Sequence, residues 1–469
     1  MKPFFLLLIT VLTATTLFAQ DNVSSSADRT SVSVTIYHNG LGLVRETRKV
    51  DLKAGISTLR YEDVSSFIIP QTVRIKSKAN PDQLTIFEQN YEYDLISSNR
   101  LMDKYVGKDV KLYRLNENGT ETEVKAKLIA NNNGPIYQIG NEISLGYSGR
   151  VVVPTIPANL FSQPTLIWKL NNQTKGSQEL EVSYQTNGMN WSADYIMVLT
   201  ENEKKSDLSS WVTLSNNSGA RFENVTLQLV AGSIKRAENS SLAKFRGGRS
   251  DELSLMSVDA PAFEQENLSE YYLYTLDQPT TLGMNQTKQV QLFATNDISV
   301  EKRYIFENLP MGSGDEKEFN RATVRYDFKN SKDNSLGRPL PKGVVRVFKA
   351  DSKGRQQLLG EDNIDHTPNN EEVKITTGEA FDVVANGKQL SFQNFSIGSG
   401  YNAEYEVSLR NRKTEDITIR LYANVGGEWK ITDSSHKFVK ESNYKGYFDV
   451  PVKADSEVKV TYSVKVSYK

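Results

Sequence analysis

The chain has 469 residues, with 56 Lys and Arg against 57 Asp and Glu, a net charge of −1, and no cysteine. A near-neutral chain with interspersed charges of both signs lacks the basic footprint of a nucleic-acid-binding protein, so no nucleic acid is expected as a partner. A chain of this length buries about three quarters of the surface that its unfolded form exposes, and it therefore needs no disulfide to support its core.

The first twenty residues have the composition of a secretory signal peptide. Lys2 precedes an apolar stretch over residues 4–12, no acidic residue is present, and the small residue Ala19 lies near the end. We expect cleavage after Ala19 or Gln20, and export to the periplasm or the cell surface. The absence of cysteine excludes a lipoprotein signal. No later apolar run reaches the ~18 residues of a membrane-spanning helix, so no transmembrane segment is expected in the mature chain.

The dominant sequence period is two, which places alternate side chains on one face of a β-strand. The clearest apolar series are Val32, Val34 and Ile36; Leu166, Trp168 and Leu170; Leu180, Val182 and Tyr184; Val225, Leu227 and Leu229; Ala322, Val324, Tyr326 and Phe328; Ile417, Ile419 and Leu421; and Val458, Val460, Tyr462, Val464 and Val466. Strands with one buried and one wet face are typical of antiparallel sandwiches. The sequence therefore predicts an all-β fold of several antiparallel, sandwich-like domains.

Asn-Gly pairs favour tight turns between these strands, because both residues tolerate a positive φ. The pairs are Asn39-Gly40, Asn118-Gly119, Asn133-Gly134, Asn187-Gly188 and Asn386-Gly387. Two further glycine-containing stretches, GYSGR at 146–150 and GSGYN at 398–402, have the wrong spacing for a phosphate loop and are interpreted as turns.

One helix is predicted over residues 98–106, where Leu101, Met102 and Tyr105 share a face. A hairpin follows, with Val110 and Leu112 on its first arm and Val124, Ala126 and Leu128 on its second. A short helix before a twisted meander suggests a small SH3-like barrel in the N-terminal half.

We expect the signal peptide at 1–20, a β-domain at 21–95, the barrel-like domain at 96–160, a β-sandwich at 161–312 and a C-terminal β-sandwich at 313–469. Residues 236–269 lack a period and mix Ser, Gly and both charge signs. This stretch is interpreted as a solvated loop or, alternatively, as a segment that becomes ordered on a partner.

The sequence contains no motif that assigns an enzymatic activity. Only three histidines are present, and H-E-x-x-H, G-x-S-x-G, G-x-x-x-x-G-K and G-x-G-x-x-G are all missing. Glu361, Asp362, Asp365 and His366 could hold a cation, or they could form a solvated turn. The irregular acidic spacing and the Thr-Pro that follows favour the turn. No catalytic, cofactor or metal residue is therefore assigned, and no cofactor is expected.

Aromatic residues can stack against sugars, and Trp191, Tyr195, Trp211 and Trp429 are the candidates near predicted strands. The alternative for each is core packing or an interface anchor. A glycosidase needs two facing carboxylates, and the sequence cannot nominate the pair among 57 acids.

Several segments resemble a broad bacterial family labelled mucoidy-inhibitor-like, built around a C-terminal domain of unknown function. They are LEVSYQTNGMNWSADYIMVL at 180–199, WVTLSNNSGARFENVTLQLVAG at 211–232, the long segment at 340–384, RNRKTEDITIRL at 410–421 and the closing YSVKV. The resemblance covers residues 165–469 and is weaker before residue 160, where many relatives carry a coiled-coil hairpin and this chain lacks heptads. It implies an exported, β-rich protein with an influence on capsule or exopolysaccharide, and it supplies no catalytic residues.

The sequence therefore favours an exported, non-enzymatic envelope protein that interacts with another envelope protein or with a glycan. The alternative is a carbohydrate-active enzyme or a lectin-like module that acts on surface polysaccharide.

Overall fold

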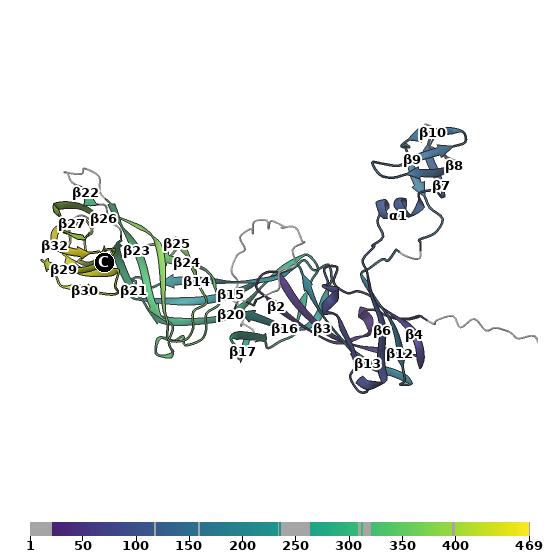
Figure 1. The fold of residues 1–469 in the computed structure, drawn as a ribbon, viewed down its shortest axis with the longest axis horizontal. Coiled ribbons are helices and arrows are strands. Elements are labelled where there is room, and N and C mark those ends of the chain that lie inside the picture. The colour runs from purple at the N-terminus through teal and green to yellow at the C-terminus, as the bar shows by residue number, and fades with distance from the viewer. Residues whose placement is uncertain are drawn as a thin grey trace, which may run out of the picture. The chain divides into compact units, whose positions relative to one another are not determined.

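The fold is known from a computed structural model that describes residues 21–116, 119–157, 160–232, 234–235, 263–307, 311–312, 320–395 and 399–468. These residues form 32 strands, one α-helix and four short 3-10 turns. The strands build several mostly antiparallel sheets, so the all-β prediction is confirmed (Figure 1). The 3-10 turns are η1 (Ser26–Asp28), η2 (Pro70–Thr72), η3 (Pro81–Gln83) and η4 (Lys332–Asn334).

The chain divides into two compact units. Unit 1 contains the residues up to Asn190 together with Ser215–Gln228 and Gln278–Gln286, and unit 2 contains the remainder. One sheet of unit 1 has the order β1 (Asp21–Ser24), β4 (Gly55–Tyr61), β12 (Thr165–Asn172) and β6 (Leu84–Glu92). The other contains, in order, β16 (Phe222–Ala231), β2 (Arg29–Tyr37), β3 (Leu41–Leu52), β13 (Gly176–Asn187) and β5 (Arg74–Ser77), with β19 (Thr280–Leu282) paired to β16.

A buried charge cluster joins the two sheets of unit 1. Arg48 on β3 lies over the ring of Tyr61 on β4, 3.6 Å from its centroid. Glu46 accepts from Arg48 at 2.8 Å and from Arg29 at 2.6 Å. The side chains of Arg48 and Glu46 are fully buried, and burying either charge alone would be costly. The paired arrangement makes the contact between the sheets specific.

The period-two series predicted from the sequence mark the buried faces. Each of the residues Val34, Ile36, Leu166, Trp168, Leu170, Leu180, Val182, Tyr184, Val225, Leu227 and Leu229 is fully buried. Alternation in the chain therefore located the core side of these strands correctly.

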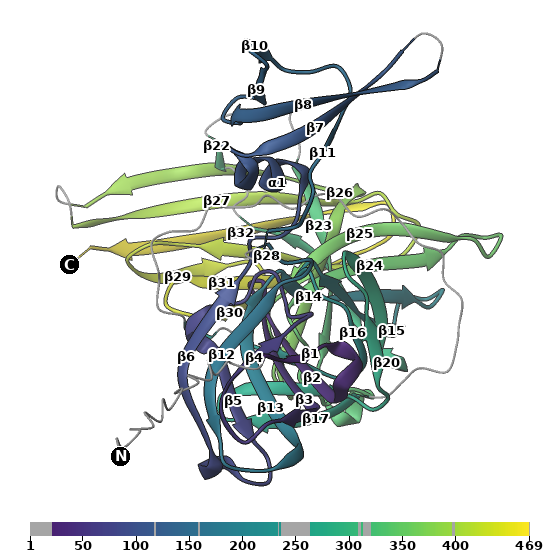
Figure 2. The same cartoon turned by 90° about the vertical axis from the view of Figure 1, so that its right-hand side faces the viewer.

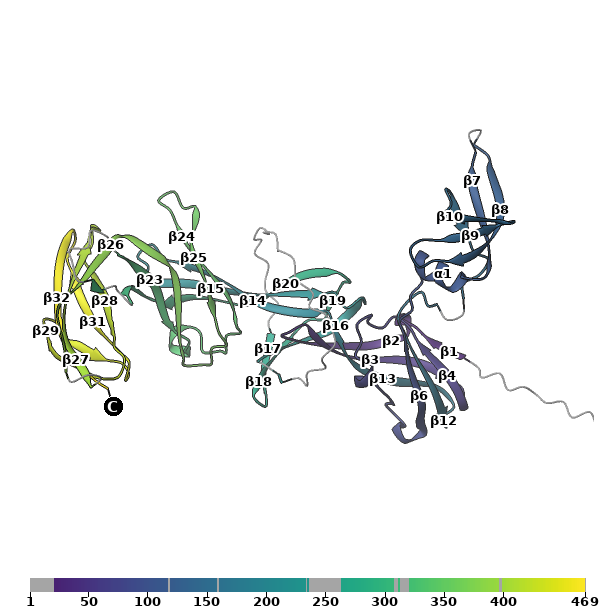
Figure 3. The same ribbon diagram turned by 45° about the horizontal axis from the view of Figure 1, so that its top comes forward.

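A small five-stranded sheet and the single helix form a module between β6 and β12. The helix α1 (Ser98–Tyr105) is capped by the hydroxyl of Ser97, which accepts from the Arg100 N–H. The strand order is β10 (Glu142–Leu145), β9 (Ile136–Ile139), β8 (Glu121–Ala130), β7 (Asp109–Leu115) and β11 (Arg150–Val152). Figure 3 shows α1 beside these strands.

The predicted helix and hairpin are therefore present. The hydrophobic core of the module consists of Tyr105, Val110, Leu112, Ala126, Leu128 and Tyr137, with Met102 and Val124 packed against it. The sheet is open, because β10 and β11 lie at opposite edges. The module is thus a helix with a meander, and its strands do not close into a barrel.

The chain returns to the first two sheets after this module. β12 pairs with β4 and β6, and β13 pairs with β3 and β5. Residues 165–187, which follow the boundary expected at residue 160, therefore complete the sheets of residues 21–92. Strand periodicity reveals which face is buried but does not reveal the partner strand, and for this reason the sequence could not show that residues 165–187 complete the N-terminal sheets.

Unit 2 contains a five-stranded sheet and a hairpin. The sheet order is β20 (Gln286–Ser299), β15 (Lys205–Asn216), β14 (Met189–Leu199), β24 (Gly343–Ala350) and β25 (Gln356–Ile364). β14 and β24 are parallel neighbours. The hairpin comprises β17 (Phe263–Leu268) and β18 (Tyr271–Leu276). β17 occupies the end of the loop predicted at 236–269, and residues 236–262 of that loop lie outside the described residues.

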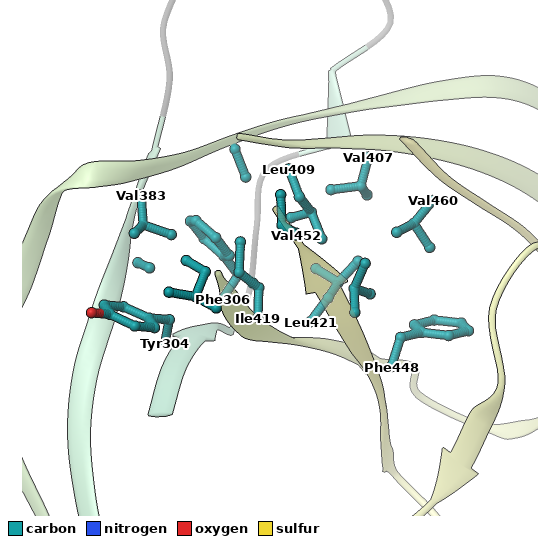
Figure 4. Close-up of a cluster of buried hydrophobic side chains, with 14 of the residues drawn as sticks. Tyr304, Phe306, Val383, Val407, Leu409, Ile419, Leu421, Phe448, Val452 and Val460 are labelled. Carbon is teal, nitrogen blue, oxygen red and sulfur yellow. The ribbon is translucent and has the colours of Figure 1, made fainter. Parts of the chain in front are cut away.

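The C-terminal part of unit 2 is a ten-stranded sheet. Its order is β29 (Glu428–Ser434), β32 (Ser456–Ser467), β27 (Gly400–Asn411), β26 (Glu372–Asn394), β23 (Asn320–Lys329), β21 (Glu301–Phe306), β28 (Ile417–Asn424), β31 (Lys445–Val452) and β30 (Phe438–Lys440), with β22 (Met311–Gly312) paired to β26. Apolar side chains from both halves of this sheet meet in one core that includes Phe306, Leu409, Ile419, Phe448 and Val460 (Figure 4). The sheet therefore folds over itself into a sandwich.

One predicted turn is wrong. Asn386 and Gly387 lie inside the 23-residue strand β26, opposite Ser408 and Val407 of β27. Arg410 donates a hydrogen bond to the Asn386 side chain. Strand pairing with β27 and β22 overrides the local preference of Asn-Gly for a turn.

Candidate functional site

The acidic run nominated from the sequence does not converge on one point. Glu361 and Asp362 are consecutive residues of β25, so their side chains leave opposite faces of the strand. An oxygen of Glu361 accepts from Arg346 Nε at 3.1 Å. Asp362 Oδ2 accepts from the backbone N–H of Thr376 at 2.7 Å. The two carboxylates are therefore directed to different partners.

Asp365 and His366 lie just after β25, and both are near Lys342. The Asp365 side chain is 94% exposed and lies 3.9 Å from Lys342 Nζ, while His366 Nδ1 accepts from the Lys342 backbone N–H at 3.1 Å. Burial lowers the pKa of His366, and the Asp365 carboxylate opposes this effect only in part. Among the described residues, no three His, Cys, Asp or Glu side chains gather as a metal site. These contacts fit a structural turn.

Glu361 belongs to a ladder of polar side chains across the five-stranded sheet. Besides Glu361, Arg346 on β24 contacts Asp194 on β14 at 3.2 Å. Asp194 accepts from Thr213 on β15 at 2.8 Å, and Thr213 accepts from Gln289 on β20 at 3.2 Å. Each of the five strands supplies one residue. The ladder therefore fixes the register of the sheet, including the parallel pair.

The aromatic residues nominated for sugar stacking are mostly core residues. Trp191, Tyr195 and Trp429 are buried, and Trp211 is half-buried. The Tyr195 hydroxyl donates to the Pro341 carbonyl at 2.6 Å, and Trp429 Nε1 donates to a backbone carbonyl at 2.6 Å. Buried aromatic rings are typical of core packing. We therefore assign Trp191, Tyr195 and Trp429 to the core.

A different set of aromatic side chains, two exposed and one half-buried, lies at one end of the C-terminal sandwich. Phe392 on β26, Tyr401 on β27 and Tyr468 just after β32 form a file across three neighbouring strands, which we call the aromatic row. The ring centroids of Phe392 and Tyr401 are 5.0 Å apart, and those of Tyr401 and Tyr468 are 6.3 Å apart. Phe392 is 52% exposed and Tyr468 51% exposed.

The aromatic row continues the inner, apolar face of the sheet. Phe392 is paired with Ala403, and Tyr401 with Val466; both partners are buried. Directly paired residues of antiparallel strands point to the same face. The row therefore lies on the core side of the sheet but remains accessible to solvent. Figure 2 shows the hairpin of β26 and β27 on the side of the unit where the C-terminal end lies.

The backbone around the aromatic row is held in place. The Phe395 N–H donates to the Gly400 carbonyl at 2.9 Å, and the Tyr468 N–H donates to the Ser399 carbonyl at 3.1 Å. Gly400 has a φ of +138°, and a Cβ there would lie 2.1 Å from the Val466 carbonyl oxygen. Only glycine fits this approach of β27 to β32. The rings are thus presented by a preformed strand end.

A neutral, polar side chain lies beside the row. Asn394 is paired with Tyr401 on the same face and is exposed. Lys465 lies between Val464 and Val466 on β32, so its side chain leaves the opposite face of the strand. Its Nζ lies 5.4 Å from the Phe395 ring. Burial and the neighbouring Tyr405 and Tyr468 raise the pKa of Tyr401, so its hydroxyl stays protonated at neutral pH. The face therefore combines aromatic rings with neutral hydrogen-bonding groups.

Sequence reasoning missed this row. From the sequence, the GSGYN stretch is interpreted as a turn, but residues 400–402 of this stretch are the first residues of β27. Residue 398 of the stretch lies outside the described residues. Aromatic residues flank it on both sides, in SFQNF before and YNAEY after. This flanking pattern was the available signal. It could not show that the rings lie together, because Tyr468 reaches them from the far end of the chain.

Comparisons with protein-family models and with curated proteins find no match to this chain. The resemblance to the mucoidy-inhibitor-like family therefore stays a prediction.

Proposed function

We propose that the chain is an exported, non-enzymatic envelope protein that binds another envelope component, a glycan or a protein, through the aromatic row. The observation that carries this proposal is the position of Phe392, Tyr401 and Tyr468 on a rigid, solvent-accessible strand end. Rings held in place before binding lose little conformational entropy when a partner covers them.

Covering the exposed parts of these rings would contribute favourable free energy to binding. Fully covering one Phe or Tyr side chain contributes about 1.5–3 kcal/mol. Because Phe392 and Tyr468 are only half exposed in the free protein, covering both would contribute about 2 kcal/mol. Hydrogen bonds to Asn394 and to the tyrosine hydroxyls would add orientation to this apolar contact.

No helix in the described part of the chain is long and apolar enough to cross a membrane. Two further observations support the proposal. The composition of the first twenty residues favours export. The acidic run at Glu361 contributes to strand register and a turn, which favours a structural role for these acids over a chemical one.

The test compares two matched double variants of the mature protein. Phe392→Ser with Tyr468→Ser alters two half-exposed rings of the row. Phe87→Ser with Tyr93→Ser alters one Phe and one Tyr that are 52% and 70% exposed elsewhere. We expect only the first pair to reduce retention on isolated envelope fractions, measured by co-sedimentation.

Both double variants must keep the circular dichroism spectrum and melting temperature of the wild-type protein. Equal retention of the wild type and the Phe392→Ser, Tyr468→Ser variant would overturn the assignment of the row as the binding surface. Turnover of an envelope polysaccharide by the purified protein would overturn the non-enzymatic part of the proposal.

A further inference from the structure

Four buried asparagines make the same set of hydrogen bonds at four places in the chain. Each one ends a strand or directly follows it, and the residue two positions earlier is a buried apolar side chain. The asparagines are Asn172 after Leu170, Asn216 after Leu214, Asn330 after Phe328 and Asn411 after Leu409. Their exposed fractions are 2% or less, and the described part of the chain has only one other buried asparagine, Asn22.

Asn411 illustrates the arrangement. Its Oδ1 accepts from the backbone N–H of Lys413, in the loop that follows β27, at 3.0 Å. Its Nδ2 donates to the carbonyl of Glu415 in the same loop at 2.8 Å. The same nitrogen lies 3.3 and 3.0 Å from the carbonyl oxygens of Val452 and Lys453, two consecutive residues at the end of β31. One side-chain amide therefore joins two loops.

The other three asparagines repeat this arrangement. Each Oδ1 accepts at 3.2 Å from a backbone N–H of its own loop, namely that of Thr174, Ser218 or Gly337. Each Nδ2 donates to a carbonyl of the same loop, namely that of Thr174, Ala220 or Arg338. Each Nδ2 also lies within 3.5 Å of two consecutive carbonyls of a second loop: Leu52 and Lys53 for Asn172, Leu282 and Gly283 for Asn216, and Thr367 and Pro368 for Asn330.

The strands around the four asparagines share one topology. At Asn411 the first loop joins β27 to β28 and the second joins β31 to β32, while β27 pairs with β32 and β28 with β31. Two successive strands thus pass over two others. The corresponding strands are β12, β13, β3 and β4 at Asn172; β15, β16, β19 and β20 at Asn216; and β23, β24, β25 and β26 at Asn330.

We infer that the four asparagines are one repeated conformational device, which we call the corner lock, and that the described part of the chain contains four copies of the same two-loop corner. A carboxamide has an acceptor and two donors on one rigid plane, so it can satisfy an N–H of its own loop and carbonyls of both loops. The lock therefore fixes the two loops relative to each other. It also fixes the register of both strand pairs, which alternation of side chains alone does not specify.

The experiment replaces each of the four asparagines by aspartate in the mature protein and measures thermal unfolding. At pH 8 the introduced carboxylate has the shape of the amide but cannot donate, and it faces carbonyl oxygens. Each variant should lower the melting temperature by about 5 °C. The control substitutions Asn90→Asp on β6 and Asn402→Asp on β27 are at exposed positions and should change it by less than about 1 °C.

A change of pH separates loss of donation from loss of packing. Burial raises the pKa of a carboxyl group, so the introduced group becomes protonated near pH 5 and regains one donor. The difference in melting temperature between the wild type and each corner variant should therefore be smaller near pH 5 than at pH 8. Equal differences at the two pH values would overturn the hydrogen-bonding role of the lock.

A loop exchange tests whether the corners are equivalent. β16 begins at Phe222 and β28 at Ile417, each six residues after its asparagine. Residues 412–416 are replaced by Asn-Ser-Gly-Ala-Arg, the sequence of residues 217–221. The exchange removes exposed ion pairs such as Asp416 with Lys453, so the protein should stay soluble and melt within about 3 °C of the wild type. Adding Asn411→Asp to the exchanged loop should lower its melting temperature as it does in the original loop.

The remaining outcomes also decide the inference. Insolubility of a corner variant, beside soluble Asn90→Asp and Asn402→Asp proteins, counts as loss of stability and supports the lock. A melting temperature like that of the wild type for any one of the four corner variants would overturn the single shared role. An insoluble loop-exchange protein would overturn the equivalence of the corners. None of these results bears on the aromatic row, which is tested separately by retention on envelope fractions.

Discussion

Glu203 contacts side chains from three strands of unit 2, and it does so from an unusual backbone position. It has a φ of +55° in the turn between β14 and β15. Its carboxylate accepts from Lys302 on β21 at 2.5 Å, Lys349 on β24 at 2.6 Å and the Tyr326 hydroxyl on β23 at 3.0 Å. A left-handed Glu costs about 1 kcal/mol in strain, and these contacts offset that cost.

These contacts make stability depend on Glu203 ionisation. Burial alone would raise the pKa of Glu203, but hydrogen bonds from Lys302 and Lys349 lower it to about 2. A depressed folded-state pKa contributes stability above the unfolded pKa near 4.5, and this contribution is lost as pH falls through about 2. Because solvent screens part of these interactions, we expect Glu203→Gln to lower the free energy of unfolding by about 1–2 kcal/mol at pH 7.

Urea unfolding of the wild type and Glu203→Gln at pH 7 and near pH 2.5 checks this prediction. The difference between the two proteins should shrink at the lower pH. Glu223→Gln, in an exposed pair with Arg221, should match the wild type at both pH values. If the difference in unfolding free energy between the wild type and Glu203→Gln is the same at both pH values, packing and not charge explains the effect of the substitution.

At the scale of elements, the module of α1 and β7 to β11 is inserted between two paired strands. Its two ends lie together, because the Ile96 N–H donates to the Phe161 carbonyl at 2.9 Å and the Phe161 N–H donates to the Asp94 carbonyl at 3.2 Å. The module also has its own core around Leu112 and Leu128. Its removal therefore leaves the β6–β12 pairing possible.

We expect replacement of residues 97–157 by a short glycine–serine linker to leave the remainder folded. The variant should unfold cooperatively in urea, with Trp168 still buried as reported by its fluorescence maximum. Shortening the excision to residues 109–130, which removes β7 and β8 so that β9 loses its pairing with β8 and β11 its pairing with β7, should cause aggregation. The prediction would be contradicted if the variant without residues 97–157 were insoluble while the variant without residues 109–130 stayed soluble.

At the scale of the whole molecule, the first strand is tied into the N-terminal sheets. β1 starts at Asp21 and pairs in parallel with β4. Asn22 donates to Ser57 Oγ and to the Thr58 carbonyl, both at 3.1 Å. The buried Arg48 donates to the Ser24 carbonyl at 3.1 Å. Residues 21–24 are thus part of the folded structure, and we expect signal-peptide cleavage to leave them in the mature chain.

Mass spectrometry of the protein recovered from the cell envelope should find Gln20 or Asp21 at its N-terminus. An N-terminus beyond Ser24 would remove the β1 contacts and should lower the melting temperature, because Arg48 would lose an acceptor inside the core. Recovery of the uncleaved chain, with Met1 retained, would contradict the export prediction.

Much of the local structure could be predicted from the order of the residues. Alternation identified the buried faces at Leu166, Trp168 and Leu170 and in the last strand, and a Ser cap with three spaced apolar residues located α1. These features are local, because the period of a strand or helix is a property of consecutive residues.

The pairing of strands and the meeting of distant side chains became visible only in the folded chain. The tertiary structure joined β12 and β13 to the N-terminal sheets, placed Asn386 and Gly387 inside β26, and directed Glu361 and Asp362 to different partners. It also brought Tyr468 beside Tyr401 to complete the aromatic row. Pairing between strands distant in the chain depends on the complementarity of whole buried faces, and a local pattern of alternation fits many possible partners equally well.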